Sequence, residues 1–302
     1  MCMRLKSMAY ISLLVIRWDQ EGVLRAMRTV PIYEGFAKAI KEICPNAWVI
    51  NFTNPMSICT KTLYDVFPEI KAFGCCHEVF HAQQFLCCVL KEIKGIDATR
   101  KDIYTDACGV NHFTWITEAK YGNLDILNLL PEFMEKFYEE GYYEEGEDRF
   151  AFNYDTFAMA NGEKEFPVVK SSEEAVELMK ALMGFGTIVS NVNMPNKGQM
   201  SQLPLGSIVE TNCVFSNDQV KPVVSNLLPE EVAELVQWNC ANIDKTYEGI
   251  KTRDLGKIYE AFVNQPLCEN LSAENAKELF KEMCLNTREY LDEFYELDTY
   301  FE

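Results

Sequence analysis

The sequence predicts an α/β fold in which a parallel sheet is followed by an α+β part, and two observations predict it. Up to about residue 100, segments with helical spacing alternate with short apolar strands, an order that implies a parallel sheet with right-handed crossovers. After that point, strands and amphipathic helices form separate runs. Because 302 residues are long for a single core, we expect a first domain over 1–100 and a second over 101–302.

The first part consists of five alternating segments. Apolar residues at helical spacing run from Ile32 to Ile43, and Pro45 closes that helix. The next segment, "AWVINFTNP", is apolar on both faces until its final Asn-Pro, as expected for a buried strand. The predicted order is helix 30–45, strand 47–55, helix 56–67, strand 70–76 and helix 77–93.

The second part begins with two predicted strands within 102–122, joined by a Gly-Val-Asn-His turn. An acidic helix over 124–143 follows, and then a strand-rich stretch over 185–216. Amphipathic helical stretches over 229–266 and 272–297 complete the pattern, with Pro229 and Ser272 at their starts.

Charge and composition limit the partners. The formal net charge is −18, with 48% hydrophobic and 25% charged residues, whereas a nucleic-acid-binding surface needs clustered Lys and Arg. The apolar run at 8–18 is too short to span a bilayer, and no small-residue cleavage site follows it. The twelve cysteines are scattered through apolar runs, where Cys behaves as a small hydrophobe. We therefore expect a protein of the reducing cytoplasm that binds neither nucleic acid nor membrane.

Polar groups follow the two predicted strands of the first part. Thr53, Asn54 and Pro55 end the first strand, and Cys76 and His77 end the second. Ligands of parallel α/β sheets bind at the carboxyl ends of the strands. This edge is therefore the predicted site.

The three histidines allow two kinds of metal site. His77, Glu78 and His81 form H-E-x-x-H, which in zinc proteases lies inside a helix so that both imidazoles share one face. Here His77 would be the first residue of its helix, and packing or capping by both histidines is an alternative. The other pairing joins Cys76 to His112, since a thiolate and a neutral imidazole bind divalent metals and leave positions open for substrate oxygens.

Four motifs run in order along the chain: "NFTNPMS", "FGCCHE", "GVNHFTW" and "NMPNKGQMSQLPLGSIVE". In this order and approximate spacing they resemble family 4 glycoside hydrolases, above all the α-galacturonidase-type branch. The resemblance extends from about Asp19 to Leu297. It implies a fold similar to that of lactate and malate dehydrogenases, with an NAD-binding Rossmann-like domain before a substrate domain, assembled as a homo-dimer or tetramer.

The resemblance also implies a glycosidase that uses NAD and Mn²⁺, an exception to the two-carboxylate scheme. Bound NAD⁺ takes hydride from sugar C3, and the resulting ketone acidifies the proton on C2. The metal holds the C2 and C3 oxygens and stabilises the enediolate that forms when a base removes this proton. The glycosidic oxygen then leaves, water adds, and hydride returns to C3. The implied substrates are α-linked carbohydrates, with α-galacturonides favoured.

The same resemblance assigns roles near the strand ends. Cys76 and His112 resemble the metal ligands, and Asn54 resembles the residue that hydrogen-bonds the sugar hydroxyls. His77 has the position of an acid/base or substrate-contacting group, which suits an imidazole near neutral pH. Asn111 orients substrate or nicotinamide, or simply forms the turn.

Further candidates complete the assignment. Asn51 and Thr53, just before Asn54, are candidates for cofactor binding. Tyr154 lies in the region where many family members place a tyrosine base, and packing in the core is its alternative. Glu78 and His81 are interpreted as structural.

The family's glycine-rich turn and acidic ribose-binding residue have no counterpart in this sequence. The chain is therefore identified as an amino-terminally truncated member in which the first half of the Rossmann-like domain is missing. Without that half the pyrophosphate of NAD loses a helix amino terminus, so we expect weak NAD binding or none. A non-catalytic remnant that binds a metal or a partner is the alternative to an active glycosidase, and a zinc protease is a third hypothesis.

Overall fold

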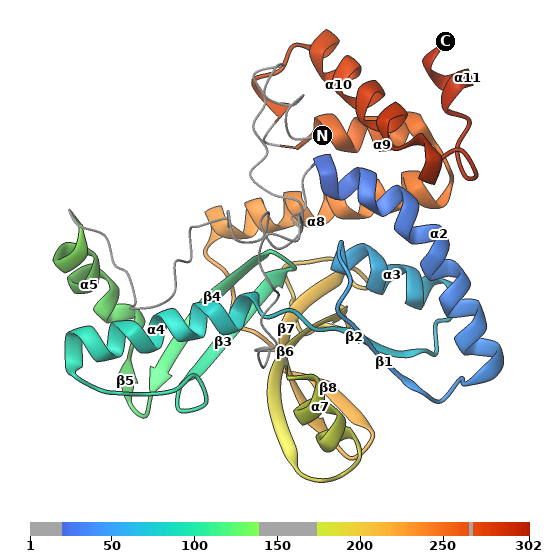
Figure 1. The fold of residues 1–302 in the computed structure, drawn as a ribbon. Helices are drawn as coiled ribbons and strands as arrows, with labels where there is room; N and C mark the ends of the chain where they lie inside the picture. Colours follow the sequence, from blue (N-terminus) through green and yellow to red (C-terminus); the bar gives the residue numbers. More distant parts are fainter. Residues whose placement is uncertain (1–19, 139–173, 266–267) are drawn as a thin grey trace, which may run out of the picture. The chain divides into compact units, whose positions relative to one another are not determined.

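A computed structural model describes residues 20–138, 174–265 and 268–302 (Figure 1). The chain divides into two compact units. The described part of unit 1 comprises residues 20–79, 106–117, 174–265 and 268–302, and that of unit 2 comprises residues 80–105 and 118–138. Within these ranges, no helix combines the length and the apolar character that crossing a membrane requires.

Unit 1 contains the predicted parallel strands. β1 (Trp48–Asn51) and β2 (Lys71–Gly74) pair in parallel, and α3 (Met56–Val66) supplies the crossover that such a connection needs. The strand predicted to reach residue 55 ends at Asn51. The side-chain oxygen of Asn51 accepts a hydrogen bond from the Thr53 backbone N–H at 3.0 Å, which turns the chain.

The first described helix is longer than predicted. α2 begins at Gln20 rather than residue 30 and extends to Ile43, with Pro31 inside it. Proline has no N–H to donate to the carbonyl one turn earlier, which here belongs to Met27. The hydroxyl of Tyr295 donates to that carbonyl instead, at 3.2 Å. The predicted start was wrong, because the helix continues through Pro31 toward Gln20.

An antiparallel ladder continues the sheet of unit 1. β6 (Thr187–Pro195) pairs with β2 and with β7 (Ile208–Ser216), and β7 pairs with β8 (Gln219–Pro222). On the other side of β7 lies β3 (Tyr104–Val110). β4 (Phe113–Tyr121) follows after the turn Asn111-His112, so the two predicted strands are confirmed but Gly109 and Val110 of the predicted turn belong to β3.

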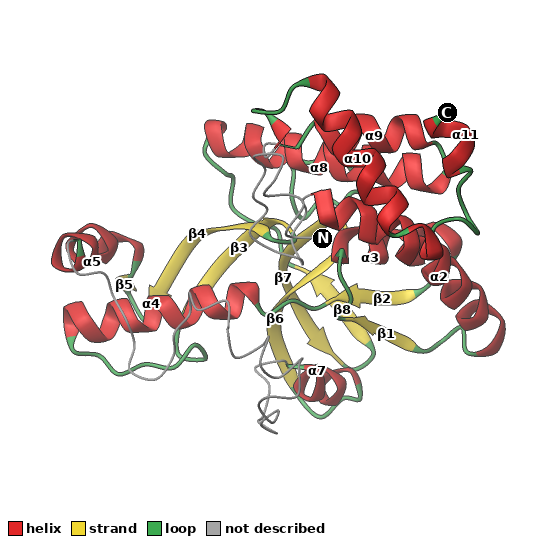
Figure 2. Cartoon of the chain, turned by 45° about the horizontal axis from the view of Figure 1, so that its top comes forward, coloured by secondary structure: helices red, strands yellow, loops and turns green. Residues whose placement is uncertain are grey.

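Helices cover both faces of this sheet (Figures 1 and 2). Neighbouring residues of a strand point to opposite faces. Val192 of β6 packs with Leu178 of α7 (Ala175–Leu182), whereas the amide nitrogen of Asn193 lies 3.4 Å from the sulfur of Met56 on α3. α7 is not among the predicted elements.

The carboxyl-terminal helices of unit 1 form the largest core with α2. This core joins α8 (Glu230–Lys251), α9 (Leu255–Val263) and α10 (Ala273–Asn286). The helical stretch predicted over 229–266 breaks after Lys251, where Asp254 caps α9 by accepting hydrogen bonds from two backbone N–H groups. Ser272 caps α10 as predicted, but α10 ends at Asn286, and η3 (Arg288–Tyr290) and α11 (Leu297–Phe301) follow.

Unit 2 contains most of α4 (Glu78–Lys94) and the outer part of β4. The helix predicted from residue 124 begins only at Leu130. β5 (Leu124–Asp125) pairs there with the end of β4, and η1 (Leu127–Leu129) precedes α5 (Leu130–Phe137). The rings of Phe85 and Phe133, 5.5 Å apart, pack α5 against α4. Tyr154 lies outside the described residues.

Candidate active site

Cys76 and His112 lie together in unit 1. Cys76 follows β2, and His112 lies in the turn between β3 and β4. The sulfur of Cys76 is 3.5 Å from Nε2 of His112, although 36 positions separate the two residues. The structure thus brings together the pair that the sequence analysis had paired as metal ligands.

A carboxylate extends this pair to a cluster of three. One ligand atom each from Cys76, Glu78 and His112 lie within 4.8 Å of one another. Cys76 is buried, and the other two residues are half-buried. A thiolate, an imidazole and a carboxylate form a donor set that suits a divalent transition metal. The residues therefore fit such an ion.

Glu78 is a residue that the sequence analysis interpreted as structural. It is the first residue of α4 and lies two positions after Cys76. The available clue was its place at the strand-to-helix junction, where side chains of an α/β sheet face the ligand.

Two glycines allow close contacts in this part of the site. A Cβ atom on Gly74 would lie 2.6 Å from Cγ of Met56, so glycine allows α3 to lie close to the end of β2. A Cβ atom on Gly109 would lie 2.4 Å from the carbonyl oxygen of Phe113, so glycine also allows the tight turn that contains His112. His112 itself has a φ of 62°, a left-handed conformation that is uncommon outside glycine.

Burial controls the protonation of the thiol. Removal from water, with a smaller contribution from Glu210, raises the pKa of Cys76 to about 12. Hydrogen bonds from the Glu78 backbone and the Asn111 side chain act in the opposite direction. A cation that binds the thiolate must therefore displace the proton of a thiol.

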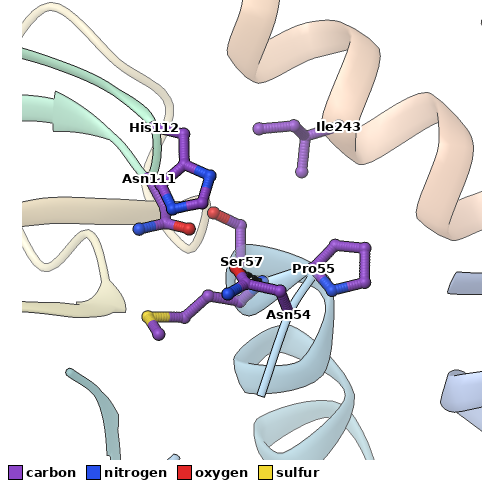
Figure 3. A pocket seen from close by; sticks show the side chains of 7 residues that line it. Asn54, Pro55, Ser57, Asn111, His112 and Ile243 are labelled. Atoms are coloured by element: carbon purple, nitrogen blue, oxygen red, sulfur yellow. Dashed lines mark hydrogen bonds between the residues drawn. The ribbon is translucent and has the colours of Figure 1, made fainter. Parts of the chain in front are cut away.

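A small pocket adjoins the cluster (Figure 3). Its wall combines the turn after β1, the start of α3, the β3–β4 turn and one residue of α8: Asn54, Pro55, Met56, Ser57, Asn111, His112 and Ile243. The side-chain oxygen of Asn54 accepts a hydrogen bond from the Met56 backbone N–H at 3.3 Å. The pocket is thus lined mainly by residues that the strand ends position.

The Ser57 hydroxyl is a polar group that the sequence analysis did not consider. Ser57 is only 3% exposed, and its oxygen has no hydrogen-bond partner among the described residues. Figure 3 shows it directed toward His112 and Asn111. A buried hydroxyl without a partner is costly, and a ligand hydroxyl in the pocket would remove that cost.

The structure also places three other predicted residues, Asn51, Thr53 and His77. Asn51 is buried, and its side-chain oxygen accepts hydrogen bonds from the Tyr33 hydroxyl at 2.6 Å and from the Thr53 N–H. In this structure Asn51 and Thr53 shape the turn that leads to Asn54.

His77 is exposed and precedes α4, which starts at Glu78. The H-E-x-x-H segment therefore does not have its first histidine inside a helix, as a zinc-protease site requires.

Two known proteins are similar to this chain over most of its length. An α-galacturonidase of Thermoanaerobacter italicus is 38% identical over an alignment that covers 89% of this chain and 73% of that protein. The crystal structure of the Bacillus subtilis protein lplD is 33% identical, with a TM-score of 0.82, and covers 92% of this chain and 78% of that one.

More distant structures share the fold. The 6-phospho-β-glucosidase of Thermotoga maritima, solved with manganese, NAD⁺ and glucose-6-phosphate, has a TM-score of 0.75 at 19% identity and covers 95% of this chain and 76% of that one. A lactate dehydrogenase from a deep-sea metagenome has a TM-score of 0.52 at 14% identity, over 75% of this chain and 70% of that one. The predicted α/β architecture of dehydrogenase type is thereby confirmed.

Matches to two models of one protein family show the family of this chain. The model of family 4 glycosyl hydrolases matches residues 18–92, and the model of the family's C-terminal domain matches residues 139–268. Together these ranges cover more than half of the chain. The chain belongs to glycosyl hydrolase family 4.

Proposed function

We propose that this glycosyl hydrolase acts on α-linked uronides, α-galacturonides in particular, and uses NAD⁺ and a divalent metal such as Mn²⁺. The observation that carries the proposal is the cluster of Cys76, Glu78 and His112 beside a polar pocket. The substrate class is supported by the α-galacturonidase relative. The cofactors are supported by the manganese and NAD⁺ bound to the Thermotoga maritima enzyme of the same fold.

In this proposal the chain's own residues hold the sugar and the ion. Cys76, Glu78 and His112 would hold the metal through sulfur, oxygen and nitrogen. When bound, NAD⁺ would supply a reversible hydride acceptor at sugar C3, and the metal would draw electron density from two neighbouring sugar oxygens.

Three polar side chains would bind and orient the substrate. Asn54, at the turn before α3, donates and accepts hydrogen bonds to the sugar hydroxyls, and Ser57 adds the buried hydroxyl described above. Asn111 lines the same pocket and orients the sugar. His77 is exposed at the start of α4, where its imidazole can donate or accept a proton at the glycosidic oxygen.

The proposal extends to the organisation of the protein. Residues 1–100 are assigned to the NAD-binding part and residues 101–302 to the substrate part. Tyr154, outside the described residues, keeps its sequence-based assignment as a candidate base. The protein is expected to work as a homo-oligomer in the cytoplasm.

Activity assays test this proposal. The full chain is incubated under reducing conditions with chromogenic α-galacturonide, α-galactoside and α-glucoside, with Mn²⁺ and NAD⁺ each present or omitted. We expect turnover of the α-galacturonide that requires Mn²⁺, requires NAD⁺ in excess because NAD binding is expected to be weak, and is lost in Cys76→Ala. Equal product release by the wild-type chain and by Cys76→Ala would refute the proposal, and a preference for another sugar would refute its substrate class.

A further inference from the structure

Glu210 is an ionisable residue in the middle of the sheet of unit 1. It lies on β7 and is fully buried, at 0% exposure. In the sheet it pairs with Gly109 of β3 on one side and with Asn193 of β6 on the other. A buried carboxyl group is tolerated only when hydrogen bonds replace its water, so its partners identify what it holds in place.

The partners of Glu210 come from two directions. One carboxyl oxygen accepts hydrogen bonds from the Thr114 hydroxyl at 2.9 Å and from the Asn111 side-chain amide at 3.4 Å. The other oxygen accepts from the side-chain amide of Asn191 on β6 at 2.9 Å. One side chain thus links the β3–β4 turn to the neighbouring strand β6.

The two turn partners lie on either side of His112. Asn111 precedes it directly, and Thr114 follows it by two positions. His112 has a left-handed backbone conformation, and the turn allows no Cβ at Gly109. A turn of this kind has few alternative shapes, so a contact on each side of His112 determines where the imidazole points.

We propose that Glu210 is a positioning residue of the metal site. By holding Asn111 and Thr114 it fixes the turn that directs His112 toward Cys76. This inference rests on the proposed function, because it assumes that Cys76 and His112 share an ion. Outer groups that orient metal ligands affect metal affinity about 10- to 100-fold, which sets the size of the expected effect.

Three variants and one control test this inference in the full chain, with Co²⁺ as the probe. Glu210→Gln keeps the volume but places an amide N–H₂ opposite one of the donor amides of Asn111 and Asn191. Thr114→Val removes one hydroxyl at nearly constant shape, and with it the donor that Glu210 at 2.9 Å shares with the Val110 carbonyl at 3.1 Å; Thr114→Ser restores it. Glu174→Gln is the matched control, because Glu174 is also a buried carboxyl group of unit 1 and accepts from the Ser190 hydroxyl at 2.8 Å. Ser190 and Asn191, neighbours on β6, point to opposite faces of the sheet.

The measurements are the Co²⁺ dissociation constant, the thiolate-to-cobalt absorption band and the melting temperature without metal. We expect Glu210→Gln to weaken Co²⁺ binding about 10- to 100-fold and to change the band. Thr114→Val should weaken binding less, and Thr114→Ser should restore it. Glu174→Gln should lower the melting temperature but bind Co²⁺ as the wild type does. If Glu210→Gln does not fold, the Thr114 pair decides.

Two results would overturn the inference. The first is an unchanged Co²⁺ affinity and band in Glu210→Gln and Thr114→Val, and the second is an equal loss in Glu174→Gln, which would indicate general destabilisation. Both leave the proposed function standing as long as the wild type binds Co²⁺ through Cys76. A wild-type chain that does not bind Co²⁺ refutes the proposed function and this inference together.

Discussion

Cys75 and Cys76 are adjacent in the chain, but their thiols have different surroundings. Cys75 belongs to an apolar cluster with Phe73 and Leu178, whereas the sulfur of Cys76 lies 3.5 Å from the imidazole of His112. Both residues are almost fully buried, at 1% and 5% exposure. Burial alone therefore does not separate a packing thiol from a candidate metal ligand, and their neighbours do.

The two thiols give a matched pair of variants. Cys75→Ala removes a packed atom and should lower the free energy of unfolding by about 1 kcal/mol, with Co²⁺ affinity unchanged. Cys76→Ala should weaken Co²⁺ binding by more than the roughly 100-fold that outer-shell changes cause. Metal titration and urea unfolding of both variants check this prediction. Equal metal affinity in the two variants would contradict it.

Ser57→Ala should affect the ligand more than the fold. Its buried hydroxyl has no hydrogen-bond partner among the described residues, so we expect the free energy of unfolding to stay the same or to rise by about 1 kcal/mol. Loss of one hydrogen bond to the sugar, worth about 1 kcal/mol, should raise KM roughly fivefold.

Thr62→Val on the same helix serves as the control for Ser57→Ala. The hydroxyl of Thr62 is buried and donates to the Ile58 carbonyl at 2.8 Å. Its removal should cost about 1 kcal/mol of stability and leave KM unchanged. Steady-state kinetics and unfolding curves separate the two effects, and a larger stability loss in Ser57→Ala than in Thr62→Val would count against the prediction.

Gly109→Ala should disturb the turn that contains His112. The new Cβ would meet the backbone of Phe113 and Thr114 at 2.4 and 2.9 Å, and backbone atoms cannot move aside as side chains can. We expect a loss of about 2–3 kcal/mol in the free energy of unfolding and weaker Co²⁺ binding. Gly122→Ala is the control, because its φ is also positive, at 56°, but its Cβ would meet open space. It should cost about 1 kcal/mol and leave metal binding intact.

Alkaline pH should destabilise the protein through its buried thiols. Burial raises the pKa of Cys59, Cys213 and Cys284 from 9.0 to about 12. Between these values the unfolded chain loses thiol protons that the folded chain keeps, so the free energy of unfolding falls as pH rises above 9. At pH 10 the loss is about 1.4 kcal/mol for each thiol. Urea unfolding at pH 8 and pH 10 measures it, and Cys284→Ala should show a smaller decrease than the wild type. Identical decreases would contradict the assignment to thiols.

Local patterns predicted the parts of the fold that local contacts determine. Alternation of helix and strand predicted the parallel pair β1 and β2, and Ser272 predicted the start of α10. The rule that parallel strands end at one edge brought Asn54 and Cys76 into one predicted site. His112 was paired with Cys76 because thiolate and imidazole chemistry agree, and the structure places the two 3.5 Å apart.

Contacts between distant residues explain the parts that the sequence did not reveal. The amino-terminal half of α2 tolerates Pro31 because Tyr295, 268 positions after Met27, donates to the Met27 carbonyl. Glu210 is the one charged residue of β7, and two of its partners, Asn111 and Thr114, lie about a hundred positions earlier. The spacing of apolar residues describes one helix or strand at a time, so it cannot indicate hydrogen-bond partners that lie in distant segments.

The separation of 96 positions between Thr114 and Glu210 also bears on the order of events during folding. Closing so long a loop has an entropic cost that must be met before its contact forms, whereas the β1–α3–β2 unit spans only residues 48–74 and closes over a shorter loop. A chain in which only that segment is folded presents the sulfur of Cys76 without a correctly aimed imidazole. An ion at the proposed site would therefore find its imidazole in place only after β7 has docked and Glu210 has bound Thr114.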